Sequence, residues 1–277
     1  MKPSDPVPRI ALNDGVRIPQ LGFGTWRVEP EDTARVVGDA LAVGYRQIDT
    51  AQMYHNERGV GDALQAAGLE REEVFVTTKC DNTEHGREAA LRALERSLEL
   101  LRLDAVDLYL IHWPMPRQDL YVDTWRGLID ARERGLARSI GVSNFQLPHL
   151  NRIIAETGVL PSVNQIELHP RFTQEPLVAE LRRLGVATQA WRPLIEGEIL
   201  TNPTIAGIAR AHGKSAAQTV IRWHLQLGYI LFPKSVRASR MRENLDVFDF
   251  ELSGEEVAAI SALNQDLRTS WDPDTTG

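Results

Sequence analysis

Short runs of apolar and β-branched residues alternate with longer helical patterns along most of the chain. The short runs have the length and composition of buried strands, and they occupy residues 20–24, 45–49, 74–79, 106–112, 138–143, 163–167, 187–191 and 229–234. Ahead of them, Asn13, Asp14 and Gly15 separate two further apolar runs, at residues 9–12 and 16–18. This turn signal predicts a β-hairpin near the start of the chain.

Between the strand runs, apolar residues recur every three or four positions, as on the buried face of a helix. One pattern follows two acidic residues and stops at Gly44, and another starts after Asn56 and stops at Gly68. A third is marked by leucines at intervals over residues 91–101, and Ser253 is the expected N-cap of the last helix. The remaining predicted helices cover residues 120–134, 148–157, 175–184, 203–212, 216–227 and 254–263.

Eight strands that each precede a helix predict an α/β protein with a parallel sheet, because parallel strands need a crossover connection. Two closures fit, an open doubly wound sheet and a (β/α)8 TIM barrel. No linker or low-complexity run divides residues 20–265, and polar residues end nearly every strand, as on the active face of a barrel. We therefore expect residues 1–277 to form a single (β/α)8 barrel domain, with the N-terminal hairpin closing its bottom and a short C-terminal loop.

Composition and charge narrow the functional class. The chain has 277 residues, of which 43% are hydrophobic and 25% charged, and its net charge is −7. These values exclude a disordered chain, and the acidic balance argues against a protein that binds nucleic acid. Cys80 is the one cysteine, the first residues lack the apolar core of a signal peptide, and no apolar run is long enough to cross a membrane. We expect a soluble cytoplasmic protein, and the spacing of the histidines predicts no metal site.

The nucleotide-binding signals are unusual. Gly22 and Gly24 begin a G-x-G-x-x-G pattern, but Arg27 stands where the third glycine belongs, and no P-loop sequence occurs. A basic cluster from Lys234 to Arg240 includes a hydroxyl residue and suits the 2′-phosphate of NADPH better than the ribose of NADH. The alternative for this cluster is the solvated start of a helix.

Four polar residues fall at or near the ends of three successive strands. Asp49, Lys79 and His112 end their runs, and Tyr54 follows Asp49 by five residues. Adjacent strands lie about 4.8 Å apart, so the four side chains can converge on one pocket. A lysine held by a carboxylate lowers the pKa of a nearby phenol and makes it a general acid, and an imidazole adds a second donor to a carbonyl oxygen. Each residue alone also fits a structural role, but their joint placement favours chemistry.

Several segments resemble the aldo-keto reductase family. Residues 44–57 (GYRQIDTAQMYHNE) resemble its first signature, residues 106–114 (VDLYLIHWP) its fourth-strand motif, and residues 141–145 (GVSNF) and 164–170 (NQIELHP) two more. Five residues resemble the late signature of the family: Lys234, Ser235, Arg240, Glu243 and Asn244. The resemblance covers about residues 10–265 and is greatest to the short bacterial members of the 2,5-diketo-D-gluconate reductase type.

This resemblance implies NADPH-dependent reduction of aldehydes, ketones or dicarbonyls to alcohols, in a barrel that uses no Rossmann domain. It makes Tyr54 the proton donor, Lys79 and Asp49 the pair that lowers its pKa, and His112 the group that orients the substrate carbonyl. Hydride would pass from C4 of the nicotinamide to the carbonyl carbon.

The resemblance also implies a set of cofactor contacts. In it, Ser143, Asn144 and Gln165 hold the carboxamide and Trp191 stacks on the nicotinamide ring. The complete set is Gly24, Thr25, Trp26, Asp49, Ser143, Asn144, Gln165, Trp191, Arg192, Leu194, Lys234, Ser235, Val236, Arg237, Arg240, Glu243 and Asn244.

The expected substrate pocket is open and tolerant, and two positions depart from the family pattern. The predicted pocket residues are Trp26, Tyr54, Asp81, His112, Trp113 and Trp271. Relatives place an apolar and then an aromatic residue where this chain has Cys80 and Asp81, which argues against carrying over an anionic keto-sugar acid as substrate. Arg192 replaces a small residue beside the pyrophosphate, where it either binds that group or swings out to gate the cofactor. For Trp271, packing on the barrel is the alternative to a pocket role.

Three function classes remain open at this point. The first is the NADPH-dependent carbonyl reductase, and the second is an NADPH-binding sensor or interaction module with little or no turnover. The third, a barrel lyase or isomerase without nicotinamide, leaves the cluster from Lys234 to Asn244 unexplained. The four retained catalytic positions favour the first, because a sensor needs no acid. By resemblance we expect a monomer whose partner is a small-molecule carbonyl substrate.

Overall fold

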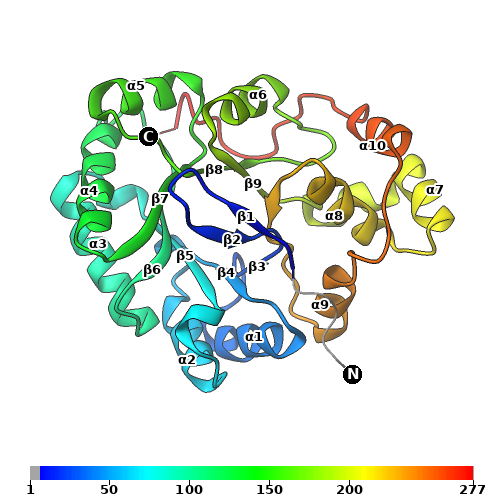
Figure 1. Cartoon of the computed structure of the whole chain (residues 1–277), viewed down its shortest axis with the longest axis horizontal. Coiled ribbons are helices and arrows are strands. Elements are labelled where there is room, and N and C mark those ends of the chain that lie inside the picture. Colours follow the sequence, from blue (N-terminus) through cyan, green and yellow to red (C-terminus); the bar gives the residue numbers. More distant parts are fainter. Residues whose placement is uncertain (1–6, 277) are drawn as a thin grey trace.

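The computed structural model describes residues 7–276, which form a closed barrel of parallel strands surrounded by helices (Figure 1). The strands are β3 Phe23–Gly24, β4 Gln47–Asp49, β5 Phe75–Cys80, β6 Val106–Ile111, β7 Ala137–Ser143, β8 Val163–Glu167, β9 Ala187–Trp191 and β10 Ile230–Leu231. Each pairs in parallel with the next strand along the chain. A parallel bridge from Leu21 to Leu231 joins the two edges. The predicted barrel is confirmed, and the open doubly wound sheet is excluded.

The helices lie outside the barrel. They are α1 Pro30–Val43, α2 Glu57–Ala66, α3 Arg87–Leu101, α4 Tyr121–Glu133, α5 Leu147–Thr157, α6 Glu175–Leu184, α7 Pro203–Ala211, α8 Ala216–Gln226, α9 Ala238–Leu245 and α10 Gly254–Ser261. As predicted, α1 ends at Gly44, whose φ of 122° suits glycine, and Ser253 caps α10. Helix α9 is not among the predicted helices, because Met241 and Leu245 are too few apolar residues to show a periodic face.

Three strands are shorter, by two residues or more, than their apolar runs predicted. The runs at 20–24, 45–49 and 229–234 give only β3, β4 and β10. Where the barrel closes, few hydrogen bonds join the segment before β3 to β10. Gly22 N donates to Leu231 O at 2.9 Å, and Leu231 N donates to Gln20 O at 3.1 Å. The remaining residues of these runs lie outside the regular ladder, and their apolar members Leu21, Tyr45 and Phe232 are still buried.

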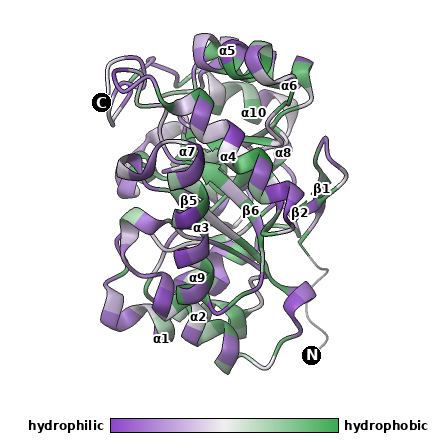
Figure 2. Ribbon diagram, turned by 90° about the vertical axis from the view of Figure 1, so that its left-hand side faces the viewer, coloured by the Kyte–Doolittle hydropathy of each residue, from purple (hydrophilic) through white to green (hydrophobic). Residues whose placement is uncertain are grey.

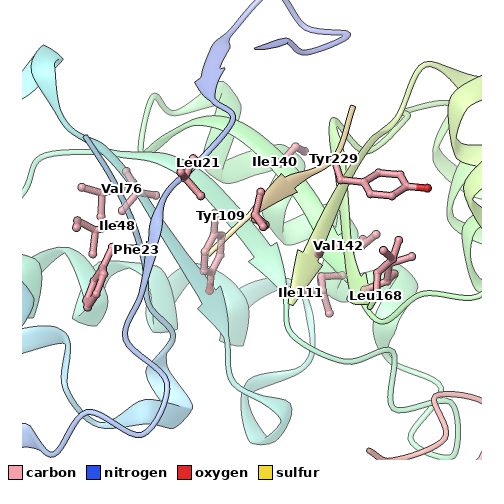
Figure 3. Close-up of a cluster of buried hydrophobic side chains, with 14 of the residues drawn as sticks. Leu21, Phe23, Ile48, Val76, Tyr109, Ile111, Ile140, Val142, Leu168 and Tyr229 are labelled. Carbon is pink, nitrogen blue, oxygen red and sulfur yellow. The ribbon is translucent and has the colours of Figure 1, made fainter. Parts of the chain in front are cut away.

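Alternation along each strand sends side chains to two separate cores. In β6, Tyr109 and Ile111 face the helices, whereas Leu108 and Leu110 face the barrel interior. Figure 3 shows part of the outer core, with side chains such as Val142 projecting from neighbouring strands. The smaller core inside the barrel combines hairpin residues, residues that begin strands, such as Phe75, Val163 and Ile230, and inward-facing residues further along. We call it the amino-end plug: Leu12, Ile18, Phe75, Leu108, Leu110, Val163, Ile230 and Phe232.

The N-terminal hairpin contributes to this plug. Strands β1 Arg9–Ala11 and β2 Arg17–Pro19 pair antiparallel, as the Asn-Asp-Gly turn predicted. Asp14, in the turn of this hairpin, accepts hydrogen bonds from Ser139 Oγ at 2.6 Å and from Ser162 Oγ at 2.7 Å. Both serines lie near the starts of β7 and β8. In Figure 1 the hairpin crosses the middle of the ring of helices. The hairpin therefore closes the bottom of the barrel, as expected.

The chain after α10 runs along the opposite end of the barrel from the hairpin (Figure 2). It is held by backbone contacts, since Gln265 N and Leu267 N both donate to Arg171 O, at 3.0 and 3.1 Å. Further along, Thr269 N donates to the buried carboxylate of Glu167 at 2.8 Å. The expected short C-terminal loop is thus anchored at the carboxyl ends of the strands. Within residues 7–276, the structure contains no helix with the length and apolar character needed to cross a membrane.

Candidate active site

The ion pair predicted from the strand ends is formed inside the barrel. Lys79 Nζ lies 2.6 Å from Asp49 Oδ1, 2.8 Å from Thr50 O and 3.4 Å from the Tyr54 hydroxyl. Lys79 is fully buried and Asp49 nearly so. All three protons of the ammonium group therefore have an acceptor, which is what a buried lysine needs in order to stay charged.

Tyr54 lies between two aromatic groups from other loops. Its ring centroid is 4.9 Å from that of Trp26 and 5.7 Å from that of His112, the latter edge to face. The loop that carries Trp26 is held by Asn56, whose Nδ2 donates to Thr25 O at 3.0 Å and to Val28 O at 3.1 Å. Asn56 directly precedes α2 but makes no side-chain cap to it, so its side chain has this tertiary role instead. The structure brings the four predicted catalytic residues together.

One expectation about Tyr54 was wrong. Burial raises its pKa above the ordinary value of 10, and the Lys79 ammonium, which lowers it as expected, offsets only part of this rise. Burial also acts to lower the pKa of Lys79, but Asp49 and Tyr54 together outweigh it and raise that pKa. The phenol is therefore protonated and the amine charged at neutral pH. A protonated phenol is the form that a proton donor must have.

His112 is held as a neutral imidazole. Burial, and then the charge of Lys79, keep its pKa well below 6.5. Its Nδ1 is buried and has no hydrogen-bond partner among the residues that the structure describes. A proton on Nδ1 would therefore be an unsatisfied buried donor, which favours the tautomer with the proton on Nε2. That nitrogen can donate to a substrate oxygen without carrying charge.

A chain of hydrogen bonds extends from Asp49 across the barrel. Gln165 Nε2 donates to Asp49 Oδ2 at 2.8 Å and to Gln189 Oε1 at 2.9 Å, and both glutamines are buried. We call Tyr54, Lys79, Asp49 and Gln165 the Asp49 network. Because the carboxylate accepts from the lysine on one oxygen and from the amide on the other, its orientation is determined from both sides.

The residues expected at the nicotinamide carboxamide have used their donors within the protein. Both N–H groups of Gln165 are engaged, Asn144 Nδ2 donates to His112 O at 3.0 Å and to Ser143 Oγ at 3.1 Å, and Ser143 Oγ donates to Gln165 O at 2.8 Å. What remains on these three side chains is capacity to accept. A carboxamide NH2 group presents two donors, so this set fits it.

The expected ring-stacking residue and the strand-end glycine also have defined positions. Trp191 ends β9, and its Nε1 donates to Asn144 Oδ1 at 2.9 Å, which fixes the plane of the half-buried indole. Gly24 lies so close to Phe232 that a Cβ would come within 3.0 Å of its carbonyl oxygen. The need for glycine at position 24 is therefore explained by barrel packing. The hydroxyl and amide of the buried Thr25 both donate to Asp49 O.

The basic cluster surrounds the start of α9. Lys234, Arg237 and Arg240 are exposed, and none pairs with a carboxylate among residues 7–276. Ser235 is buried and accepts a hydrogen bond from Arg237 N at 3.1 Å. On this helix Glu243 is partly buried and Asn244 is buried. Unpaired cations at a helix N-terminus fit a bound phosphate. The cluster is therefore at the start of a helix, which was the alternative interpretation, and that position also suits an anion.

Arg192 belongs to a second ionic cluster, which sequence reasoning did not find. The Glu196 carboxylate accepts from Arg192 Nη2 and from Arg27 Nη1, each at 2.8 Å. Arg192, Ile195 and Glu196 all have φ near +50°, a region that favours glycine. Leu194 packs on the outer core within this strained segment. The cluster joins the loop after β9 to the loop after β3.

Two of the residues expected in the substrate wall contact each other. Trp113 and Trp271 pack with ring centroids 5.6 Å apart, so the C-terminal loop does reach the carboxyl end of the barrel. Trp26, Trp271 and Val236 are exposed. Asp81 Oδ1 accepts from the backbone N–H of Thr83 and so caps a short 3₁₀ helix. Its place in the pocket remains a prediction.

Three further residues near the site were not among those predicted from the sequence: Gln189, Glu167 and Thr50. Gln189 is a polar residue in the middle of a buried strand run, and that anomaly points to an interior role. Glu167 ends β8, the preceding strand, and is buried there, with its Oε1 accepting from Thr269 N and from the side chain of His169. Thr50 acts through its backbone carbonyl, which no side-chain pattern reveals. Among residues 7–276, no group of three or more His, Cys, Asp or Glu is placed to bind a metal.

Comparison with known proteins gives matches over nearly the whole chain. A Mycobacterium sp. (strain JLS) protein named aldo-keto reductase is 52% identical over 268 residues, 97% of each chain. The Yersinia pestis methylglyoxal reductase DkgA is 50% identical over 272 residues, 98% of each chain. The crystal structure of Gox0644 in its apo form has 47% identity and a TM-score of 0.95, covering 99% of this chain and 100% of that one. A Gox0644 variant was solved in complex with NADPH, with 46% identity and a TM-score of 0.95.

The family assignment follows from fold, site and sequence together. Residues 20–265 match the sequence profile of the Aldo/keto reductase family. The motifs that suggested this family supply Asp49, Tyr54 and His112, and the structure places these three with Lys79 in one site. The chain belongs to the aldo/keto reductase family.

Proposed function

We propose that this protein is an NADPH-dependent oxidoreductase that reduces aldehydes, ketones or dicarbonyls to alcohols. The observation that carries this proposal is the buried contact of Tyr54 with Lys79 and of Lys79 with Asp49 at the carboxyl end of the barrel. The relatives support it, since the DkgA proteins are named methylglyoxal reductases and the Gox0644 variant binds NADPH. NADPH, when bound, supplies the hydride for the carbonyl carbon.

Tyr54 is the proton donor for the oxygen of the substrate. Its phenol is protonated at neutral pH and lies in contact with a charged lysine. As negative charge develops on the carbonyl oxygen, the phenol can transfer its proton, and the adjacent ammonium stabilises the phenolate that remains. Asp49 keeps the ammonium charged and in place. Lys79 does not bring the pKa of Tyr54 below its ordinary value before the reaction. Its contribution is to stabilise the phenolate that forms when the proton has been transferred.

His112 orients the carbonyl group. A neutral imidazole with its proton on Nε2 offers one directional hydrogen bond and adds no charge beside Lys79. Its ring packs edge to face against that of Tyr54, which supports the proposal that both donors act on one substrate oxygen. Two donors that converge on one oxygen stabilise the developing oxyanion.

The cofactor is held at two ends. Gln165, Asn144 and Ser143 offer acceptors for the carboxamide NH2, and Trp191 offers a fixed aromatic face for the nicotinamide ring. At the other end, the exposed unpaired cations at α9 suit the 2′-phosphate that distinguishes NADPH from NADH. Arg192, which donates to Glu196, is the residue proposed to act at the pyrophosphate, either by binding it or by gating it.

The substrate class is small carbonyls and dicarbonyls such as methylglyoxal. Trp26, which contacts Tyr54, and the Trp113–Trp271 pair are the proposed aromatic wall of the pocket, and Asp81 would make an anionic keto acid a poor fit. A monomer is the proposed state, because large exposed apolar side chains outside the site are limited, within the described residues, to Leu120, Leu160 and Leu267. Cytoplasmic location is proposed with it, consistent with a single buried free cysteine, Cys80.

The test is NADPH consumption by the purified protein against methylglyoxal, an aromatic aldehyde and a keto-sugar acid. Wild type should reduce the first two faster than the third. Replacement of Tyr54 by Phe removes only the hydroxyl, so kcat should fall by about 10²–10⁴-fold while NADPH affinity stays within about twofold. Binding of NADPH without turnover of any carbonyl would instead support a sensor, and absence of NADPH binding would contradict the assignment altogether.

A further inference from the structure

Gln189 has a position in the site that the activity does not explain by itself. It lies in the middle of β9, is fully buried, and faces the barrel interior opposite Gln165, with which it is paired in the β8–β9 register. Its Oε1 is 2.9 Å from Gln165 Nε2. One hydrogen bond links Gln189 to Gln165, a proposed cofactor contact, and a second hydrogen bond links Gln165 to Asp49.

The chemistry of Asp49 determines which way both amides point. The carboxylate is paired with Lys79 and can only accept, so the atom of Gln165 at 2.8 Å must be its nitrogen. The second N–H of that nitrogen then points at Gln189, which must present its oxygen. The Gln165 oxygen is left as the atom free to accept from a ligand.

We propose that Gln189 is a positioning residue for carbonyl reduction. By accepting the second N–H of Gln165, it holds that amide with its nitrogen on Asp49 and its oxygen toward the nicotinamide carboxamide. This inference rests on the proposed function, because it assigns Gln165 to the carboxamide of NADPH. Gln189 itself does not contact the reacting atoms and acts only through Gln165.

The substitution Gln189→Met tests the contact with little change in volume. It removes the acceptor, so the second N–H of Gln165 is unsatisfied in a buried setting and the amide is free to rotate away from both Asp49 and the cofactor. Gln189→Glu is the conservative partner, because its carbonyl oxygen can still accept from Gln165. Gln189→Leu is a second acceptor-free variant in case Met packs poorly.

The barrel interior offers a matched control in Gln47. This glutamine is also fully buried, on the inward face of β4 two residues before Asp49. Both of its amide atoms are without a hydrogen-bond partner in the described part of the chain. Gln47→Met therefore removes a buried interior amide without removing a bond to the Asp49 network.

The experiment measures two dissociation constants by isothermal titration calorimetry on the full-length protein. One ligand is NADPH, and the other is 2′-phospho-ADP-ribose, which has the same adenosine and phosphates but no nicotinamide. Gln189→Met and Gln189→Leu should raise the Kd of NADPH by about fivefold, the effect of one lost hydrogen bond, and leave the Kd of the fragment within about twofold. Gln189→Glu and Gln47→Met should leave both constants within about twofold of wild type.

Two results would overturn the inference. One is an unchanged Kd for NADPH in both acceptor-free variants, and the other is an equal loss of affinity for both ligands, which indicates general damage to the barrel. The selective loss of NADPH affinity, restored by Gln189→Glu, supports it, since a purely structural role does not distinguish the two ligands. Failure of the wild-type protein to bind NADPH is a different outcome and would count against the proposed function.

Discussion

The two ends of the barrel interior are built from the same strands but have opposite properties. Strand β5 supplies Phe75 to the amino-end plug and, four residues later, Lys79 to the Asp49 network. Strand β8 supplies Val163 to the plug and Gln165 to the network. The plug is apolar, so packing stabilises it without specific partners. The network contains a fully buried charge, which is tolerated because the Lys79 ammonium and both oxygens of the Asp49 carboxylate have hydrogen-bond partners.

The difference teaches how stability and chemistry are separated in this barrel. The plug and the hairpin close the amino end by contacts that need only shape and volume. The carboxyl end carries the buried ion pair, the strained left-handed residues of the β9 loop and the anchored C-terminal loop. A change at the amino end should therefore alter folding alone, whereas one at the carboxyl end should alter both folding and catalysis.

The largest expected effect comes from breaking the buried ion pair. Lys79→Met leaves the Asp49 carboxylate buried with only Gln165 as a partner, so the free energy of unfolding should fall by about 3–5 kcal/mol. Urea unfolding measures this change, and carbonyl reduction should be lost as well.

An ion pair near the amino end serves as the control. Arg71 pairs with Asp107 at 2.7 Å, but the same carboxylate also accepts from Arg138 at 3.0 Å, and both arginines are partly exposed. Arg71→Met should therefore cost only about 1 kcal/mol and leave kcat unchanged. Equal losses of stability in the two variants would show that the two ends do not differ as described.

The next prediction concerns a substitution that removes part of the amino-end plug and contacts no residue of the Asp49 network. Ile18 is fully buried in the hairpin and packs among the plug residues. Ile18→Ala deletes buried methyl groups, so unfolding should become easier by about 2–5 kcal/mol. Below its unfolding temperature the variant should retain kcat and the NADPH Kd within about twofold, since neither depends on the plug. A kcat that falls in proportion to stability would contradict the separation of the two ends.

The smallest expected effect is a pH dependence of the free energy of unfolding, caused by a histidine near the carboxyl ends of the strands. His85 follows β5, its two ring nitrogens are buried and without partners among the described residues, and burial lowers its pKa to about 4. The unfolded chain, with an ordinary pKa of 6.5, binds the proton first as the pH falls. The stability present above pH 6.5 is therefore lost on acidification toward pH 4, by about 1 kcal/mol between pH 7 and 5.5 for this residue.

Urea unfolding at several pH values measures this slope. His112 and His224 have lowered pKa values of the same sign, so the wild-type slope is steeper than one histidine accounts for. His85→Leu removes one titrating group and should flatten the slope between pH 7 and 5.5. An identical slope in wild type and variant would remove His85 from this account.

Much of this protein was determined by its sequence alone. The barrel follows from strand and helix periods, because those periods reflect which face of each element is buried. Asp49, Lys79 and His112 could be singled out because parallel strands bring their carboxyl ends to one face. The family resemblance added the cofactor set, and the acceptor pattern of Gln165, Asn144 and Ser143 agrees with it.

Only the tertiary structure decided the rest. Helix α9 was not among the predicted helices, because its few apolar residues are buried by contacts with α1 and α8 that its own sequence does not reveal. The pairing of Gln165 with Gln189 and the bridge from Arg27 to Glu196, 169 residues apart, join segments whose distance no local pattern encodes. The net pKa of Tyr54 is decided by how deeply the completed fold buries the phenol beside Lys79. Strand identity is local and is therefore readable in the sequence, whereas burial and long-range partners exist only once the chain has closed.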